Sequence, residues 1–538
     1  MNYFSKTTLL PILPLLGTLG SCNVEPEETA RPNIIFIMTD DHAWQAVSAY
    51  GEQLAEVAPT PHIDRLAGEG MRFDRCLVTN SICGPSRATI LTGKYGHING
   101  FYSNEMTDFD GTQQTFPKLL QDGGYQTAVI GKWHLGSEPT GFHHWDILPG
   151  QGHYYNPEFI NKEGHYTVEG YVSDIITDKT LAWLDQERDK NKPFMVMMHH
   201  KAPHREWEPA LKYLDHFDNI DFPIPETLFD DHSGRGTAAG EADMTIAETI
   251  RMDADLKMWG ETTQYKHTYE GTYSRLNQEQ RKVWDTYYNR VKQELEEANL
   301  QGDELVKWKY QRYLQDYLGT ILSVDESMGR VLDYLKDAGL DKNTIVVYTS
   351  DQGFFLGEHG WFDKRFMYEI SYRTPLLIRW PGTTQPGTVN TDIVSNLDFA
   401  QTFLEAAQLS KPNDMQGASI VPLLKEQTPA NWRKDHYYHY HAYPDWHMVK
   451  RHYGIADERF KLMHFYYDID EWEMYDLEKD PNELKNVYHD PAYTEVRDDL
   501  HRRLEALRVK YGDSDELMES FLPDSNDFKE LKNRYIHR

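Results

Sequence analysis

Four apolar stretches of this sequence each end beside residues that can bind metal ions or move protons. The stretches span residues 33–39, 127–130, 194–198 and 344–349, and their branched side chains are typical of buried parallel strands. The polar clusters that follow them are Asp40-Asp41, Lys132 with His134, 199–204 and Asp351-Gln352. Because ligands bind at the carboxyl ends of strands in α/β sheets, we expect these clusters to meet at one edge of a sheet.

A divalent cation best explains the acidic part of this set. Asp40, Asp41 and Asp351 offer three carboxylates, and Gln352 adds an amide oxygen. Oxygen ligands suit calcium or magnesium rather than zinc, and carboxylates that converge without a cation would repel one another. One aspartate after a strand is more often a turn former, so the predicted Ca²⁺ site, with Mg²⁺ as the alternative, depends on the combination.

Residues 81–94 form the most specific segment of the sequence. Cys83-Gly84-Pro85-Ser86-Arg87, followed by Leu91-Thr92-Gly93, resembles the signature of type I, formylglycine-dependent sulfatases of the alkaline-phosphatase superfamily. The resemblance covers about residues 32–510, because other family segments follow in the family's order at 33–41, 131–136, 201–204, 350–353 and 472–483. It implies an alkaline-phosphatase-like fold and a sulfuric ester hydrolase.

The resemblance also implies how Cys83 would act. In this family the cysteine is oxidised to formylglycine (3-oxoalanine) during export, by a formylglycine-generating or anaerobic sulfatase-maturing enzyme. A hydrated aldehyde has two geminal hydroxyls: one attacks sulfur, and the other, once deprotonated, expels the sulfate, so catalysis proceeds in two easier covalent steps. Cys83 is also expected to join the metal ligands, as is Gln352, where many family members carry Asn or His.

Five other residues take catalytic roles by their match to the family. Arg87 lies about one helical turn after Cys83 and would neutralise charge there, at a helix start whose positive end favours sulfate. Lys132 is expected to contact the sulfate or the nucleophile, and Lys364 is expected to bind the sulfate. The two remaining roles fall to histidines: His134 would take a proton as the intermediate collapses, and His204 would meet the leaving oxygen.

Weaker similarity concerns the substrate. Segments 149–155 and 364–369 resemble bacterial N-acetylglucosamine-6-O-sulfatases, which implies a sulfated glycan substrate, best the 6-O-sulfate of N-acetylglucosamine in glycosaminoglycans or mucin. Residues 436–464 hold six of the 24 histidines and several aromatic side chains, a composition that suits sugar rings, although the core of a small sheet explains it equally well. The predicted sugar contacts are Asp363, Arg365, His447 and His452.

Two other functions stay open. A phosphodiesterase or phosphonate monoester hydrolase of the same superfamily would share the metal site, and some of those enzymes also use formylglycine. An inactive glycan-binding lipoprotein would have lost metal or nucleophile residues, and no such loss is visible. The formal net charge of −30 excludes a general affinity for nucleic acid, so any anion must bind in a local cationic pocket.

The N-terminus is typical of an exported lipoprotein. Lys6 precedes an apolar run at 9–19, which is too short for a bilayer span of ~20 residues. The run ends at Leu19-Gly20-Ser21-Cys22, which resembles a lipobox with Cys22 as the lipidated residue, though an ordinary signal with a chance cysteine would look similar. We expect a signal peptide at 1–21, a tether at 22–31, and a periplasmic or cell-surface protein that meets the membrane only through its lipid.

The remaining patterns predict the elements that must position the site. Apolar runs alternating with helical patterns indicate an α/β catalytic domain at 32–425, built on a large, mixed, mostly parallel sheet with helices on both faces. Another buried parallel strand is expected at 375–380, and a helical insertion at 205–310. Cys76 has no predicted role beyond core packing.

Composition changes again near residue 430. Short aromatic runs at 460–467 and 472–475 predict a small antiparallel sheet, and a charged helix is expected at 494–511. We therefore expect a smaller C-terminal α+β subdomain at 426–538.

Overall fold

The computed structural model describes residues 1–6, 8, 31–106, 108–259 and 266–535. The apolar run at 9–19 and Cys22 lie outside the described residues, so the signal peptide, tether and lipidation site stay predictions. The chain from Arg31 onward forms one compact unit. Among the residues that the structure describes, none of the helices is long and apolar enough to cross a membrane.

The four strands expected to carry the site are present and parallel. They are β1 (Asn33–Thr39), β3 (Gln126–Lys132), β7 (Phe194–His199) and β8 (Thr344–Ser350). They lie in the order β8-β1-β7-β3, and the register pairs Ile35 of β1 with Val196 on one side and Val346 on the other. The carboxyl ends of all four therefore meet at one edge of the sheet.

The margins of this sheet are mixed. β4 (His144–Leu148) continues it in parallel, and β5 (Glu158–Asn161) and β6 (Gly164–Thr167) close that side as antiparallel strands. On the other side lie β11 (Arg373–Arg379), β2 (Met71–Leu77), β12 (Thr388–Asn390) and β13 (Val394–Ser395). The described strands thus form a large mixed sheet with a parallel centre, as predicted.

The strand expected at 375–380 exists as β11, but its predicted direction is wrong. β11 runs antiparallel to both β8 and β2. Between β8 and β11 the chain forms the short pair β9 (Phe355–Leu356) and β10 (Phe362–Asp363), a 3-10 turn at Glu358–Gly360 and the one-turn helix α10 (Glu369–Tyr372). A parallel neighbour needs a long crossover, usually a helix that returns the chain to the opposite edge of the sheet. The helical segments in this connection are only one turn long, too short to make that crossover.

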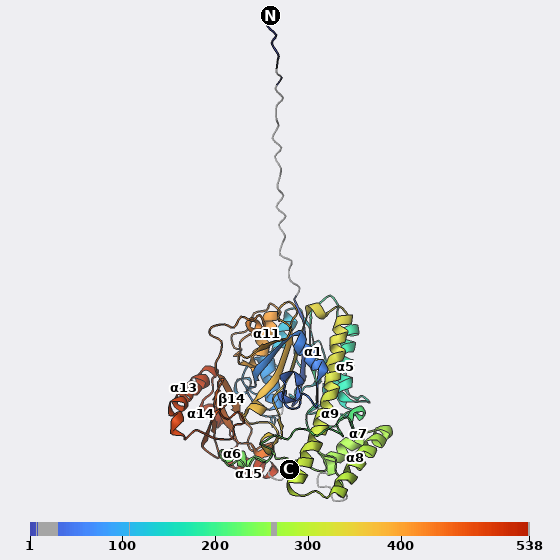
Figure 1. The fold of residues 1–538 in the computed structure, drawn as a ribbon, viewed down its shortest axis with the longest axis vertical. Helices are drawn as coiled ribbons and strands as arrows, with labels where there is room; N and C mark the ends of the chain where they lie inside the picture. The colour runs from blue at the N-terminus through green and yellow to red at the C-terminus, as the bar shows by residue number, and fades with distance from the viewer. Residues whose placement is uncertain (7, 9–30, 107, 260–265, 536–538) are drawn as a thin grey trace. The chain divides into compact units, whose positions relative to one another are not determined.

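Helices cover both faces of the sheet, and β1 shows why. Ile34 and Phe36 pack into one hydrophobic cluster while Ile35 and Ile37 pack into another, because alternate side chains of a strand point to opposite faces. One face is covered by α1 (Pro61–Glu69), α5 (Val172–Ala182) and α9 (Gly302–Asp337), and the other by α2 (Cys83–Thr92), α4 (Phe116–Asp122) and α11 (Phe399–Ala406) (Figure 1).

The predicted helical insertion at 205–310 is correct only in its second half. Helices α7 (Lys266–Arg275) and α8 (Gln278–Ala298) are present, and α9 begins at Gly302. Before residue 260, however, the described chain consists mainly of turns, with the short helix α6 (Thr237–Glu241). Pro209, Pro223 and Pro225 contribute to this outcome, since proline lacks the N–H that a helix interior requires.

The C-terminal sheet is antiparallel throughout. It consists of β14 (His436–Tyr440), β15 (His452–Ala456), β16 (Phe460–Phe465) and β17 (Glu471–Asp476), with α13 (Thr494–Tyr511) packed on it. Met463 and Tyr475 of this sheet share a hydrophobic cluster with Leu77 and Ile82 of the catalytic part. The remaining helices are α3 (Gly96–Asn99), α12 (Val421–Leu424), α14 (Asp515–Ser520) and α15 (Ser525–Tyr535). The boundary between the catalytic domain and the C-terminal subdomain, placed at 425/426, stays a prediction.

Candidate active site

Three aspartates converge at the carboxyl edge of the sheet. Asp40 and Asp41 directly follow β1, and Asp351 directly follows the neighbouring strand β8. All three are fully buried, and one carboxylate oxygen from each lies within 4.8 Å of the others. The structure therefore brings together the three aspartates predicted to bind a metal.

Each of these aspartates is paired with one cation. Burying three carboxylates this close together is costly, and a buried charge is tolerated only when it is paired. The pairs are Asp40 with Lys132, Asp41 Oδ2 with Lys364 Nζ (2.7 Å), and Asp351 Oδ2 with Arg87 Nη2 (2.8 Å). The three cations are the ones that sequence analysis assigned to sulfate and charge stabilisation.

The donor set fits a hard divalent cation. Neither oxygen of Asp40 accepts a hydrogen bond from a described residue, although the Lys132 ammonium lies against Oδ2. Gln352 Nε2 donates to Asp41 Oδ1 (2.5 Å), and its Oε1 has no hydrogen-bond partner among the described residues. Burial raises the pKa of Asp41, and the charge of Asp351 raises it further against the lowering effect of Lys364. Buried acceptors without partners are what a cation would satisfy.

Cys83 is the first residue of α2 and is 1% exposed. Its Sγ accepts a hydrogen bond from Asn104 Nδ2 (3.4 Å), and Asn104 Oδ1 accepts one from Gly84 N (3.0 Å). Sγ also lies within 4.8 Å of an oxygen of Asp40 and a ring nitrogen of His204. Burial raises the pKa of the Cys83 thiol, so an unmodified cysteine here is a weak nucleophile.

Ser86 and Arg87 of the motif both bond to Asp351, one of the three clustered aspartates. Ser86 Oγ donates to the backbone oxygen of Asp351 (2.5 Å). Arg87 donates through Nε and Nη2 to Asp351 Oδ2, and through Nη1 to the backbone oxygen of Lys132 (2.9 Å). Sequence analysis expected Arg87 to reach toward position 83, whereas these bonds direct its guanidinium to Asp351 and to the end of β3.

Cys83, His134 and His204 line one cavity, which has a volume of about 570 Å³. His204 Nδ1 donates to the backbone oxygen of Arg205 (2.6 Å), and its Nε2 lies 3.9 Å from Asp41 Oδ2. His134 Nδ1 has no hydrogen-bond partner among the described residues. Burial lowers the pKa of both histidines, and the nearby Lys132 lowers it further, so the neutral imidazole is favoured.

Three of the four predicted sugar contacts line the cavity, where all three are buried. Asp363, Arg365 and His447 line the same cavity as Lys364 and Cys83. His447 Nε2 lies 3.3 Å from Asp363 Oδ2, and Arg365 is paired with Asp363 Oδ1. These side chains form a charged group beside Lys364 in the lining of the cavity.

The fourth predicted contact, His452, is not at the cavity, and this expectation is corrected. Its ring is fully buried within the C-terminal sheet. Nδ1 donates to the backbone oxygen of Lys450 (2.8 Å), and Nε2 accepts from the backbone N–H of Met367 (3.1 Å). Both ring nitrogens are therefore occupied by backbone groups, and Nε2 joins β15 to the loop after Lys364.

Sequence analysis missed several residues that line the cavity. Gln151 accepts a hydrogen bond from Lys132 and connects that lysine to the cavity, which Lys132 itself does not line. Gln151 lies in the segment 149–155 that the sequence had indicated, whereas Asn104 carried no sequence signal. The other lining side chains that sequence analysis gave no role are Glu105, His153, Lys201, Arg205, Glu206, Arg251, Thr272 and Trp446.

At several residues around the site the backbone adopts a conformation that residues other than glycine rarely take. Positive φ angles occur at Asp41 (70°), His134 (56°), Asp363 (79°), Arg365 (94°) and His447 (66°). Such residues cost of order 1–3 kcal/mol each and persist where the surrounding structure imposes them. Their concentration here indicates that the positions of these side chains are imposed at a cost in stability.

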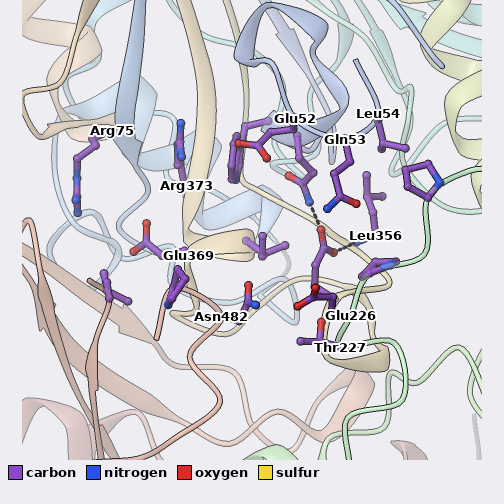
Figure 2. Close-up of a pocket in the computed structure, with 18 of the residues that line it drawn as sticks. Glu52, Gln53, Leu54, Arg75, Glu226, Thr227, Leu356, Glu369, Arg373 and Asn482 are labelled. Atoms are coloured by element: carbon purple, nitrogen blue, oxygen red, sulfur yellow. Dashed lines mark hydrogen bonds between the residues drawn. The ribbon is translucent and has the colours of Figure 1, made fainter. Parts of the chain in front are cut away.

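A second hollow, of about 530 Å³, opens elsewhere on the molecule and contains none of the predicted site residues (Figure 2). Two of its charged side chains already contact other parts of the protein. Glu369 pairs with Lys461 (3.0 Å), and the Arg373 guanidinium lies over the Trp44 ring, 3.7 Å from its centre. We assign no ligand to it.

Comparison with known proteins decides which chemistry this arrangement serves. The family model described as "Sulfatase" matches residues 32–409. The chain belongs to the sulfatase family. A second model, "N-sulphoglucosamine sulphohydrolase, C-terminal", matches residues 357–510. The predicted family, fold class and activity, a sulfuric ester hydrolase that acts on O-sulfate, are confirmed.

This sulfatase is similar to enzymes named for one sulfated sugar. It is 53% identical over 519 residues to N-acetylglucosamine-6-O-sulfatase of Bacteroides thetaiotaomicron, covering 95% of this chain and 92% of the relative. The human N-acetylglucosamine-6-sulfatase is 29% identical, over 80% of this chain and 71% of its own. The solved structure of BT4656 in complex with its substrate D-glucosamine-2-N,6-O-disulfate is 53% identical, covers 90% of this chain and 99% of its own, and has a TM-score of 0.87.

Proposed function

We propose that this sulfatase removes the 6-O-sulfate from an N-acetylglucosamine or glucosamine residue of glycosaminoglycan or mucin glycans. The observation that carries the proposal is the 53% identity to an N-acetylglucosamine-6-O-sulfatase along 95% of the chain, a match long enough to include every part of the cavity around Cys83. In this proposal the sulfate lies beside Cys83 and Lys364, and the sugar lies beside the charged group of Asp363, Arg365 and His447.

The proposed nucleophile is the formylglycine formed from Cys83 by a maturation enzyme, whose hydrate supplies an oxygen in place of the poorly ionised thiol. The start of α2 and the amide of Asn104 would position it. The proposed metal is calcium, with magnesium as the alternative, held by Asp40, Asp41, Asp351, Gln352 and position 83. When bound, it would polarise the sulfate oxygens.

The side chains around the proposed sulfate position have complementary roles. Lys364 reaches the cavity directly and Lys132 reaches it through Gln151, so both can balance the charge of the sulfate. The Arg205 carbonyl keeps the Nδ1 proton of His204 in place, so proton exchange with the leaving sugar oxygen takes place at Nε2. His134, with Nδ1 free of described partners, is the proposed acceptor of the proton released as sulfate departs.

A panel of defined substrates tests the proposed specificity. Sulfate release from 6-sulfated N-acetylglucosamine and from glucosamine-2-N,6-O-disulfate is expected to exceed release from 3-O-sulfated glucosamine and 6-sulfated N-acetylgalactosamine by about 10-fold or more, because one lost polar contact at a site costs ~1–3 kcal/mol. An aryl phosphate diester serves as the comparison for the rival activity. Preference for the diester, or for a sulfate at another position, would contradict the proposal.

The charged group of Asp363, Arg365 and His447 is expected to bind the sugar and not the sulfate. His447→Ala is expected to lower kcat/KM for the sulfated glycan about 5–150-fold, because losing one polar contact at a buried site costs ~1–3 kcal/mol. Asp363→Ala should act in the same direction, since Asp363 contacts both His447 and Arg365. Turnover of a small aryl sulfate should change little in either variant, and steady-state kinetics on both substrates measures the difference.

His464→Ala provides the matched control for His447→Ala and Asp363→Ala. His464 lies on β16 of the same C-terminal sheet, stacked on Trp472, and does not line the cavity. Both substrates should turn over normally in this variant. If His447→Ala and Asp363→Ala lower kcat/KM equally for the glycan and the aryl sulfate, these residues act at the sulfate site and do not bind the sugar.

We also propose that the enzyme is exported and anchored through a lipid on Cys22, because 19–22 reads Leu-Gly-Ser-Cys after an apolar run. Cys22→Ala is expected to move the protein from the membrane fraction to the soluble fraction of the cell envelope, as measured by fractionation and immunoblotting. Unchanged membrane association in this variant would contradict lipid anchoring.

A further inference from the structure

The last described helix, α15, packs on the loop between β14 and β15. Its final residue, Tyr535, is 4% exposed and shares a hydrophobic cluster with Tyr443 of that loop, and Phe528 of the same helix packs against the cluster. The two family models match residues 32–409 and 357–510, so neither includes this helix. α15 is therefore an addition to the segments that the family models describe.

The helix contacts a turn whose residues line the active-site cavity. The turn is the 3-10 helix Trp446–Met448, and both Trp446 and His447 line the cavity of Cys83. The Tyr535 ring packs against the Trp446 ring, with 5.9 Å between the ring centroids and 56° between the ring planes. Aromatic rings attract one another at such separations, so Tyr535 holds the Trp446 side chain in place.

This turn needs support because its backbone is strained. His447 and Met448 have positive φ angles of 66° and 53°, which persist only where the surrounding structure imposes them. Asp445 caps the turn by accepting a hydrogen bond from the backbone N–H of Trp446 (2.7 Å). His447 Nδ1 donates to the backbone oxygen of Asp243 (2.5 Å), and the Asp243 N–H donates to the backbone oxygen of His447 (2.8 Å). The contacts of α15 add a further support from the end of the chain.

Tyr535 also lies near a second segment of the cavity lining. Burial raises the pKa of the Tyr535 hydroxyl, and the nearby Glu105 carboxylate raises it further. Glu105 lines the same cavity as Trp446 and His447, although it is far from them in sequence. One side chain of α15 thus lies beside two separate segments of the lining.

We propose that α15 positions the sugar-binding part of the cavity, with Tyr535 acting through Trp446 on the turn that carries His447. Tyr535 does not line the cavity itself, so it acts as a positioning residue and does not touch the substrate. The inference rests on the proposed function in one respect, which is that the substrate is a sulfated glycan whose sugar lies beside His447.

Tyr535→Ala tests this role in the full-length matured enzyme. kcat/KM for the sulfated glycan is expected to fall about 2–12-fold, mainly through a higher KM, because the ring contact that holds Trp446 is lost. A small aryl sulfate has no sugar to bind and should keep its wild-type kcat and KM. Tyr535→Phe retains the ring and should show wild-type kinetics on both substrates. A loss in Tyr535→Phe as large as that in Tyr535→Ala would contradict the ring contact.

A double-mutant cycle shows whether Tyr535 acts through Trp446. In a Trp446→Ala background the ring contact is already gone, so adding Tyr535→Ala is expected to cause no further loss of kcat/KM for the glycan. Residues that act independently give additive losses. Full additivity of the two substitutions would therefore overturn the proposal.

Met518→Ala is the matched control. Met518 belongs to α14 in the same C-terminal segment and is 6% exposed, but it packs in the cluster beneath α13 and does not line the cavity. This variant should have a lower Tm and unchanged kinetics on both substrates. Circular dichroism confirms folding before kinetics are measured. If Tyr535→Ala fails to fold, Phe528→Ala gives the same test, because it removes the ring contacts of α15 with Tyr443 and Tyr467.

The glycan in these assays is the one that the wild-type enzyme desulfates fastest in the substrate panel, whatever the position of its sulfate. A failure of the proposed 6-O specificity therefore appears in the wild-type panel. A failure of this inference appears instead as wild-type glycan kinetics in Tyr535→Ala, or as equal losses on the glycan and the aryl sulfate.

Discussion

Replacing Cys83 by alanine is expected to abolish sulfate release, by on the order of 10⁴-fold or more, because the covalent route loses its nucleophile. Cys83→Ser should be almost as inactive. A serine offers one hydroxyl, so an esterified serine has no second hydroxyl to expel the sulfate. Both variants should fold, since position 83 contributes one small side chain at the start of α2. Sulfate release and intact mass of the peptide covering position 83 measure the outcome.

Cys76→Ala is the matched control for this experiment. Cys76 is also fully buried, on β2, but it packs in the hydrophobic cluster of the sheet and does not line the active-site cavity. Its replacement should cost some stability and leave activity intact. A fully active wild-type protein whose Cys83 peptide retains the unmodified thiol would refute the formylglycine mechanism.

Removal of the divalent cation is expected to produce the second large effect. Chelation should inactivate the enzyme and calcium should restore it, while Asp40→Ala and Asp351→Ala should lose metal and activity together, by at least ~10³-fold, because the cation supplies much of the charge that stabilises the reacting sulfate. Elemental analysis and sulfate release, measured on the same samples, give the two quantities.

Removing an aspartate also breaks a buried ion pair, which costs ~3–5 kcal/mol and could unfold the protein. Asp398→Ala controls for this loss. Asp398 is fully buried and paired with Arg433 through two hydrogen bonds, but it is not part of the metal cluster. This variant should be destabilised while keeping metal and activity per folded molecule. Full activity in protein shown to be metal-free would contradict the metal assignment, and restoration by magnesium alone would identify magnesium as the metal.

Much of the active site could be predicted from sequence because strand ends are local features. An apolar run such as 33–39 identifies a buried strand, and Asp40-Asp41 follows it directly. Once several parallel strands are inferred, geometry places their carboxyl ends together, so the convergence of Asp40, Asp41 and Asp351 needed no knowledge of side-chain contacts. The motif around Cys83 added the chemistry through its resemblance to a family.

The incorrect expectations share a different physical origin. The direction of β11 depends on whether the connection from β8 crosses the sheet, and the position of His452 depends on how β15 packs against the loop after Lys364. Neither is written in the local pattern of residues. His452 and His447 lie five residues apart in the same histidine-rich segment, yet one ring is buried in a sheet and the other lines the cavity.

By itself, the sequence determined the strands, the family motif and the set of polar residues that the strand ends deliver, because these depend on residue type and on spacing within one segment. Only the tertiary structure decided the partners: Arg87 with Asp351, Asn104 with Cys83, Gln151 with Lys132, and Trp446 with Tyr535. These pairs join segments tens to hundreds of residues apart. Their distances are set by how helices and loops pack on the sheet, which no local pattern encodes.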